Sequence, residues 1–314
     1  MNKIVFFGGK GGVGKTSCSA AFAAYTAKQG KKTLIVSTDP AHSISDIFEM
    51  PIGMDTTHIR DNLDGIEIDA EHESEKYIEG VKRSLGKVIS PIIMEEINRQ
   101  LDASSISPGT HEAAVFDKMI EIIVEKSGDY DQIVFDTAPT GHTIRLFSLP
   151  ELLGVWIDSL LAKRERALEV SQMTKSVDRG SKDYLDHDPI LKILNRRKTN
   201  MEKAREIMID DKKLDFIFVL NAEKLPIEET KKAIDILKKY DMPVRDLVIN
   251  RILPDKMTDD FWKSKKEDEV KYVAEIEGFF SDKSIIKLPL LPKDMRAHNI
   301  DDMAAYFEDA LGEK

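Results

Sequence analysis

The stretch GKGGVGKT, residues 9–16, places two lysines and four glycines within eight residues. Its spacing satisfies G-x-x-x-x-G-K-[ST], a loop in which backbone N–H groups cradle phosphates, with Gly9 and Gly14 as the two fixed glycines. Glycine suits such a loop because a Cβ would block close approach of the backbone and would disfavour positive φ angles. Lys15 would then neutralise the β- and γ-phosphates, and the Thr16 hydroxyl would bind Mg²⁺. The predicted chemistry is nucleotide and magnesium binding; the alternative is a glycine-rich turn that binds no nucleotide.

Two elements must position this loop. The preceding residues, KIVFFG, form an apolar run typical of a buried strand, and Ser17 to Gln29 is rich in alanine with apolar residues at helical spacing. A strand, a glycine loop and a helix in this order are the context that the pattern requires. The residues expected to contact nucleotide here are Gly9, Lys10, Gly11, Gly12, Val13, Gly14, Lys15, Thr16 and Ser17.

Two aspartates follow later strand-like runs. Asp39 comes shortly after the run Thr33 to Ser37, and Asp136 ends the run QIVFD. Catalytic groups of open parallel sheets collect at the carboxyl ends of strands. Asp39 is therefore a candidate for orienting the attacking water, with capping of a short helix near Ser43 as the alternative. Asp136 is a candidate for holding Mg²⁺, directly or through water.

The composition excludes several classes of protein. The 314 residues carry a net charge of -10, which argues against a broad nucleic-acid surface, since such a surface needs clustered Lys and Arg. Hydrophobic residues make up 41% and charged residues 32%, the balance of a soluble globular protein. No apolar stretch is long enough to cross a bilayer and no secretory leader is recognisable, so we expect a cytoplasmic protein. Cys18 is the only cysteine, so we expect neither an internal disulfide nor a paired-cysteine metal site.

Strand-like runs alternate with helical stretches along the chain, and they lie near residues 3, 33, 66, 132, 215, 247 and 285. This order predicts an α/β fold with a predominantly parallel, doubly wound sheet. Two long segments, 72–127 and 150–212, are helix-patterned and rich in charge. We therefore expect these segments to form an all-helical subdomain, inserted into a nucleotide-binding domain of residues 1–71, 128–149 and 213–314.

Lys10, directly after the first glycine, is not required by an ordinary phosphate-binding loop. The sequence KGGVGKT resembles the deviant Walker A motif of the ATPase family that includes MinD, ParA, the nitrogenase iron protein, ArsA and the ATPase that targets tail-anchored proteins. In that family this lysine crosses a dimer interface to the partner's phosphates. The resemblance implies a homodimer in which Lys10 and Lys15 both serve ATP hydrolysis; for Lys10, a solvated loop lysine is the alternative.

Two further motifs narrow the resemblance to one branch of the family. TDPAHS, which contains Asp39, resembles switch I of ArsA and the tail-anchored targeting ATPases, where this aspartate polarises the attacking water. DTAPTGHTIR, which begins at Asp136, resembles switch II of the same branch and separates the chain from MinD and ParA. The resemblance implies ATP and Mg²⁺ as cofactors.

The resemblance also implies contacts with the nucleoside, from Glu223, Asn250, Pro289 and Pro292. The two prolines lie in IIKLPLLPKDMR, which is similar to the family's adenine loop. An amide suits adenine because it donates and accepts hydrogen bonds at once. From the residues alone, Asn250 could equally be a turn former at a strand end.

The chain departs from the family pattern at its cysteines. Targeting ATPases commonly carry a Cys-x-x-Cys pair that clamps the dimer through zinc, and Lys263 and Lys266 stand about where those cysteines would fall. We therefore expect no zinc. The metalloid site of ArsA needs several thiolates, and Cys18 stands alone, so the chain is poorly equipped to bind arsenite.

The two helical segments decide the expected function. Their methionines, which suit surfaces that accept varied hydrophobic partners, are Met94, Met119, Met173, Met201 and Met208. The resemblance implies that ATP closes a dimer whose inserts form a groove for the transmembrane helix of tail-anchored clients, with a membrane receptor and transient membrane contact. Ordinary core packing is the alternative reading of the helices. Two alternative functions remain open: the ATPase of an arsenite or antimonite pump, and a ParA-like positioning ATPase.

Overall fold

The computed structural model of the chain describes residues 3–39, 43–85, 108–137, 157–159, 161–166, 168–169, 185, 188–256 and 259–311. The chain forms two compact units. The sheet unit comprises Met1–Asp69, Lys126–Ile144 and Ile207–Lys314, and the helical unit comprises Ala70–Glu125 and Arg145–Glu206. Each unit is therefore assembled from segments that are far apart in the sequence.

The sheet unit contains one eight-stranded sheet in the order β3-β4-β2-β5-β1-β6-β7-β8. Neighbouring strands run parallel except β3 and β4, which are antiparallel, so the predominantly parallel α/β sheet predicted from the sequence is confirmed. The edge strand β3 was not expected, because its residues THIR are only partly buried and form no apolar run. The strands are β1 Ile4–Gly8, β2 Thr33–Ser37, β3 Thr57–Arg60, β4 Leu63–Glu67, β5 Gln132–Asp136, β6 Leu214–Asn221, β7 Val244–Ile252 and β8 Ser284–Pro289.

The central strands are buried on both faces, which explains their continuous apolar sequences. On one face Phe6 of β1 stacks on its register partners in the two neighbouring strands. Its ring centroid lies 4.5 Å from that of Phe135 and 5.1 Å from that of Phe216. On the other face Phe7 packs against Phe22 of the first helix at 5.4 Å. Successive side chains of one strand thus pack into the hydrophobic layers on opposite faces of the sheet.

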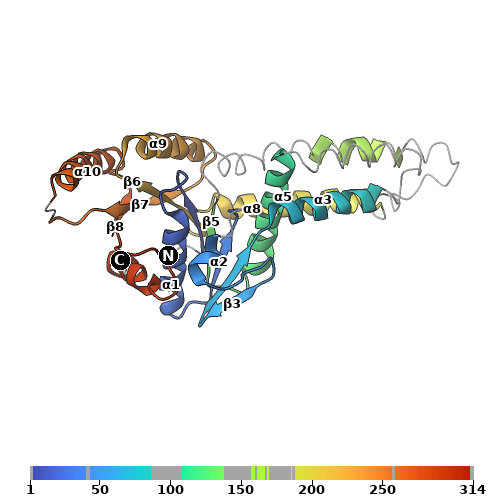
Figure 1. Ribbon diagram of the computed structural model, residues 1–314. Coiled ribbons are helices and arrows are strands. Elements are labelled where there is room, and N and C mark those ends of the chain that lie inside the picture. The colour runs from blue at the N-terminus through green and yellow to red at the C-terminus, as the bar shows by residue number, and fades with distance from the viewer. Residues whose placement is uncertain are drawn as a thin grey trace. The chain divides into compact units, whose positions relative to one another are not determined.

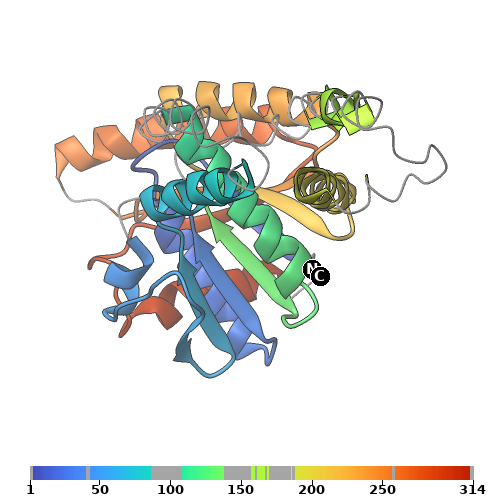
Figure 2. The ribbon, with the colours of Figure 1, turned by 90° about the vertical axis from the view of Figure 1, so that its right-hand side faces the viewer.

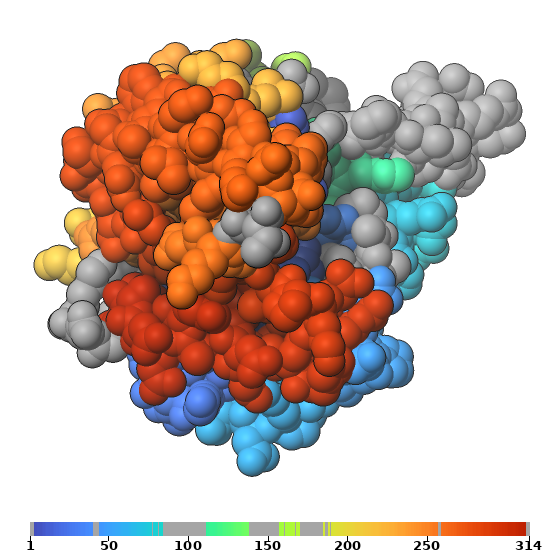
Figure 3. Space-filling model, turned by 60° about the vertical axis from the view of Figure 1, so that its left-hand side comes forward, coloured from blue at the N-terminus to red at the C-terminus, as the bar shows by residue number. Residues whose placement is uncertain are grey.

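Helices cover both faces of the sheet. In Figure 1 and Figure 2, α1 and α11 lie on one side of the strands and α9 and α10 on the other. On the face shown in Figure 3, the orange and red segments from β7 to α11 form most of the visible surface, and blue amino-terminal segments appear below them. Pro226 lies in the first turn of α9, where a missing N–H costs no helical hydrogen bond. The helices of this unit are α1 Lys15–Lys28, α2 Ser43–Phe48, α9 Lys224–Lys239, α10 Asp260–Phe279 and α11 Ile300–Leu311.

The helical unit contains α3 Ala70–Leu85, α5 Pro108–Lys126 and α8 Pro189–Met208. Asp188 caps α8, accepting hydrogen bonds from the backbone N–H groups of Ile190 (3.1 Å) and Leu191 (3.0 Å) and from the guanidinium of Arg164 (2.7 Å). Although burial opposes it, this set of donors holds the pKa of Asp188 below its ordinary value. The short helical segment that contains Arg164 is therefore tied electrostatically to the start of α8.

The methionines of the helical segments divide between buried positions and positions outside the described residues. Met119, Met201 and Met208 are buried, and they belong to the packed interior rather than to an exposed apolar surface. Met94 and Met173 lie outside the residues that the structure describes. Within its described part, the chain has no helix that is both long and apolar enough to cross a bilayer.

Candidate functional site

The glycine loop joins β1 to α1 at the carboxyl edge of the sheet, and its glycines are required for two different reasons. Gly12 has φ +83 and open space around it, so only its backbone conformation favours glycine. At Gly9 an added Cβ would collide with the carbonyl oxygen of Val219 in β6, and at Gly14 it would collide with the side-chain amide of Asn250 in β7. The loop therefore lies directly on the ends of β6 and β7.

Lys15 is the first residue of α1 and is only 6% exposed. Burial lowers the pKa of its ammonium, while the charges of Asp136 and Asp39 oppose this effect. Its Nζ donates a hydrogen bond of 3.4 Å to the carbonyl oxygen of Lys10. Gly14, the residue that precedes the helix, offers no side-chain cap, so the first N–H groups of α1 face the loop without one. A buried cation beside uncapped helix N–H groups is suited to binding phosphate.

Asp136 ends β5 at the centre of this edge, in register with Phe7 of β1 and Ser37 of β2. It is fully buried, and neither of its carboxylate oxygens accepts a hydrogen bond of good geometry from the residues that the structure describes, although the Thr16 and Ser19 hydroxyls lie close by. Burial raises the pKa of Asp136 to about 7, although the nearby Thr16 hydroxyl and the charge of Lys15 oppose this rise. A buried carboxylate that accepts no hydrogen bond is stabilised by nearby positive charge, which Lys15 supplies in part and a bound metal ion would increase.

The donor set fits Mg²⁺. Magnesium prefers hard oxygen ligands, and a nucleotide site supplies one or two protein ligands, with phosphates and waters completing the octahedron. The Asp136 carboxylate and the Thr16 hydroxyl provide such oxygens beside the phosphate loop. No group of three or more His, Cys, Asp or Glu side chains suitable for a metal occurs in the described part of the chain, which is compatible with a magnesium ion held mainly by the nucleotide.

Asp39 follows β2 at the same edge, and its charge is close enough to affect the pKa of both Lys15 and Asp136. Its backbone N–H donates to Ser37 Oγ at 3.2 Å. The alternative expectation was that Asp39 caps the helix near Ser43, but another carboxylate accepts hydrogen bonds from the start of that helix. The N–H groups of Ile44 (3.0 Å) and Ser45 (2.9 Å) at the start of α2 donate to the carboxylate of Glu67.

Glu67 was not identified from the sequence. It ends β4, is buried, and also accepts a hydrogen bond of 2.8 Å from the Ser45 hydroxyl. Glu67 thereby fixes α2, which begins only a few residues after Asp39. An acidic residue that ends a strand-like run is the same signal that identified Asp136, so the sequence did contain a clue.

The residues expected to contact the nucleoside lie at the carboxyl ends of β6, β7 and β8. Glu223 is exposed and immediately precedes α9, and Pro289 ends β8. Pro292 is exposed in the loop that follows. Asn250, by contrast, is only 4% exposed; its Nδ2 donates to the carbonyl oxygen of Val13 at 2.8 Å. All four residues thus lie at the edge that carries the phosphate loop, but only Asn250 bonds directly to it.

Asn221 is a further polar residue at this edge that sequence reasoning missed. It ends β6 in register with Asn250 of β7. Its Oδ1 is buried and lacks a hydrogen-bond partner among the residues described. An unpaired buried amide oxygen costs free energy, so a ligand group that donates a hydrogen bond would be favoured at this position.

The side chain of Lys10 forms a weak ion pair within its own chain. Its ammonium lies 3.8 Å from Glu229 Oε1 of α9, and its side chain is 32% exposed. Exposed ion pairs of this kind contribute between about 0 and 1 kcal/mol. Lys10 is therefore held only lightly within its own chain.

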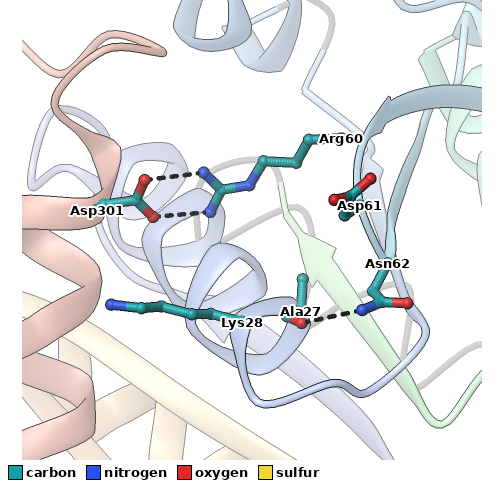
Figure 4. Close-up of a pocket in the computed structure, with 6 residues that line it drawn as sticks. All are labelled: Ala27, Lys28, Arg60, Asp61, Asn62 and Asp301. Carbon is teal, nitrogen blue, oxygen red and sulfur yellow. Dashed lines mark hydrogen bonds and ion pairs between the residues drawn. The ribbon is translucent and has the colours of Figure 1, made fainter.

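A cavity of about 600 Å³ lies at the opposite, amino edge of the sheet (Figure 4). Arg60 crosses it to form two hydrogen bonds with Asp301, of 2.9 and 3.1 Å, and the Asn62 amide donates to the carbonyl oxygen of Ala27 at 3.5 Å (Figure 4). The side chains of Arg60, Asp301 and Asn62 therefore have partners within the protein. Although this cavity is large, its chemistry is that of a structural contact, and it is separate from the phosphate loop.

Comparison with known proteins agrees with the carboxyl-edge site. The family model of the anion-transporting ATPases matches residues 2–308. A protein of Aquifex aeolicus named arsenical pump-driving ATPase 2 is 38% identical over 288 residues, which is 91% of this chain and 92% of that protein. ATPase ASNA1 homolog 1 of Paramecium tetraurelia is 32% identical, covering 99% of this chain and 93% of the relative. ATPase GET3B of Arabidopsis thaliana is 33% identical, covering 94% and 75%. The match covers both the glycine loop at residues 9–16 and the buried Asp136. The chain therefore belongs to the family of anion-transporting ATPases and hydrolyses ATP.

Proposed function

We propose that this ATPase is a homodimer that closes on Mg·ATP and then binds the transmembrane helix of tail-anchored proteins. The observation that carries the proposal is the connection between its two units. The chain leaves the sheet unit for the helical unit after β4, which ends at Glu67, and again beyond β5, which ends at Asp136. Both strands end at the edge that carries the phosphate loop, and in this proposal a change in nucleotide state is passed to the helical unit along the segments that follow them.

The residues of this edge have distinct roles in the proposal. Lys15 and the loop amides hold the β- and γ-phosphates, and Thr16 and Asp136 hold Mg²⁺, which neutralises charge on the phosphates. Asp39 orients the attacking water. Glu223, Asn250, Pro289 and Pro292 surround the nucleoside.

Lys10 links hydrolysis to dimerisation in this proposal. For its ammonium to reach the phosphates of the partner subunit, it must first leave Glu229. Because that ion pair is exposed and 3.8 Å long, breaking it costs little. Dimer closure would therefore exchange a weak contact within one chain for a strong contact with phosphate.

The client groove is proposed for the apolar stretches SPIIMEEINRQL and LPELLGVWIDSLL, which lie almost entirely outside the described residues. The described methionines do not contribute to it, since Met119 and Met201 are buried.

We place the protein in the cytoplasm, with transient contact to a membrane receptor when a client is released, and we propose no nucleic-acid partner.

The test is co-purification with a tail-anchored substrate, with and without Mg·ATP, against a control substrate that lacks its transmembrane helix. Capture that requires the helix and changes with nucleotide supports the proposal. An active ATPase that captures neither substrate under any nucleotide condition would refute the client-binding role and leave the enzyme assignment intact.

An arsenite or antimonite pump ATPase is the second candidate, because several relatives are named arsenical pump-driving ATPases. Cys18 argues against it. The thiol is fully buried on α1, and burial raises its pKa far above the ordinary value, so the metal-binding thiolate is strongly disfavoured. ATPase activity that rises several-fold with arsenite or antimonite would favour the pump over the targeting role.

A further inference from the structure

Asn250 uses both ends of its side-chain amide within the protein. Its Nδ2 donates to the carbonyl oxygen of Val13 at 2.8 Å, and its Oδ1 accepts from the backbone N–H of Arg251 at 2.9 Å. The residue is 4% exposed. The side chain is therefore fixed at both ends and lies beneath the phosphate loop.

The backbone of β7 is shaped to aim this amide at the loop. The register between β7 and β8 shifts between Ile249 and Ile252, which marks a bulge. Within it Arg251 adopts φ +60, a left-handed conformation that is unfavourable for a side chain of this size. Bulges beside active sites commonly redirect one side chain, and this one turns the Arg251 N–H toward the Asn250 oxygen. A strained backbone is thus maintained where it orients Asn250.

The contact at Val13 determines the direction of the next N–H group. In a trans peptide the C=O of one residue and the N–H of the following residue point in opposite directions. Because Asn250 draws the Val13 oxygen toward β7, the Gly14 N–H points away from β7. Among the residues that the structure describes, no acceptor bonds to this N–H, so it remains available to a ligand. Gly14 also has to be glycine here, because a Cβ would collide with the Asn250 amide.

We propose that Asn250 is a positioning residue of the phosphate loop, which holds the Val13–Gly14 peptide so that the Gly14 N–H faces the phosphates of ATP. This role goes beyond a contact with adenine, because it acts on the triphosphate whichever base is attached. It depends only on the ATPase activity of the chain and is independent of the targeting function proposed above.

Inorganic tripolyphosphate separates the two roles because it carries no base. In Asn250→Ala we expect the dissociation constants of Mg·ATP and of Mg·tripolyphosphate to rise together, by about fivefold to tenfold, as for the loss of one hydrogen bond between neutral groups. We also expect faster hydrogen exchange across residues 9–16 in the nucleotide-free protein. Asn250→Ser, whose hydroxyl is too short to reach Val13, should behave in the same way and serves if the alanine variant does not fold.

Asn299 provides a matched control. It is 9% exposed, its Nδ2 donates to the carbonyl oxygen of Asp294 at 2.9 Å, and its Oδ1 accepts from the Arg296 N–H at 2.7 Å. Asn299→Ala therefore removes a similarly buried amide, but one far along the chain from the loop. It should lower the melting temperature as Asn250→Ala does, without weakening tripolyphosphate binding.

Two results would overturn the proposal. Weaker binding of ATP with unchanged binding of tripolyphosphate would show that Asn250 acts through the base. A lower melting temperature with unchanged tripolyphosphate binding and unchanged exchange of residues 9–16 would show that Asn250 has only a general structural role, like that of Asn299.

Discussion

The two edges of the sheet differ in whether their charged side chains have hydrogen-bond partners within the protein. At the amino edge, charged groups satisfy one another: Arg60 bonds to Asp301 through both nitrogens, and Asp64 accepts from Tyr130 at 2.9 Å and lies 3.0 Å from His58. At the carboxyl edge, Asp136 is buried without a hydrogen-bond donor among the described residues. A buried carboxylate whose oxygens accept no hydrogen bond destabilises the folded protein. Within the described residues, the buried carboxylate without a hydrogen-bond donor thus lies at the edge where we propose that ATP and Mg²⁺ bind.

The largest expected effect is on Lys15. Lys15→Gln removes the buried cation that we propose contacts the phosphates, and we expect kcat to fall by roughly 100- to 1,000-fold, as for other groups that stabilise transition-state charge. Steady-state ATPase assays at saturating Mg·ATP measure this fall. A variant that stays within threefold of wild type would show that the carboxyl edge does not depend on this cation.

The next effect concerns Asp39. Asp39→Asn keeps the shape of the side chain but removes the charge that we propose orients the attacking water, so kcat should fall by about 100-fold or more while the dissociation constant of Mg·ATP changes less than threefold. Single-turnover hydrolysis and equilibrium binding measure the two quantities separately. Hydrolysis at the wild-type rate by a variant that binds ATP normally would remove Asp39 from the mechanism.

Asp136→Asn separates stability from function. In the wild-type protein without nucleotide, the pKa of Asp136 is raised to about 7, above the ordinary value of 3.8. The folded state therefore binds the extra proton between these values, and the free energy of unfolding decreases as pH rises from about 4 to 7. The asparagine variant lacks this loss, so at pH 8 we expect it to be more stable by on the order of 2 kcal/mol.

Urea unfolding in EDTA at pH 5 and pH 8 measures the difference between Asp136→Asn and wild type, which should be larger at pH 8. The same variant should need a higher Mg²⁺ concentration for activity. Equal stabilisation at both pH values would contradict the proposed cost of the buried charge.

One pair of carboxylates at the amino edge is an exception, because two like charges face each other there. Burial, reinforced by the neighbouring Asp246, raises the pKa of Asp215 to about 7, although Asp215 accepts a hydrogen bond of 3.1 Å from the Arg245 N–H. Asp246→Asn removes the repulsion, so we expect it to raise the free energy of unfolding at pH 8 by about 1 kcal/mol, with less effect at pH 4. Its ATPase activity should match wild type. A loss of activity would show that the two edges are coupled.

The smallest effect is expected at the cavity of the amino edge. Arg60 and Asp301 are partly exposed, so a double-mutant cycle with Arg60→Ala and Asp301→Ala should give a coupling of less than about 1 kcal/mol. Chemical denaturation of the four proteins provides the cycle, and kcat should stay unchanged in all of them. A coupling above 2 kcal/mol would mean that exposed pairs at this edge contribute more than their solvent exposure allows.

Much of the site was predictable because its signals are local. The strand, glycine loop and helix around Lys15 are contiguous, and Asp136 could be assigned because an acidic residue at the end of an apolar run must lie at the carboxyl edge of a parallel sheet. Glu67 gave the same signal more weakly. The edge strand β3 gave none, because an exposed edge needs no apolar run.

The sequence by itself determined the fold class, the place of the phosphate loop and the edge at which the acidic residues meet, because strand and helix periodicity and the loop pattern act within a few residues. Only the tertiary structure decided what the loop rests on. Asn250 lies 237 residues from Val13, and the collision that excludes a side chain at Gly9 comes from Val219. The pairing of Lys10 with Glu229 likewise depends on how α9 packs. Contacts of this kind follow from the order of strands in the folded sheet, and no local pattern encodes them.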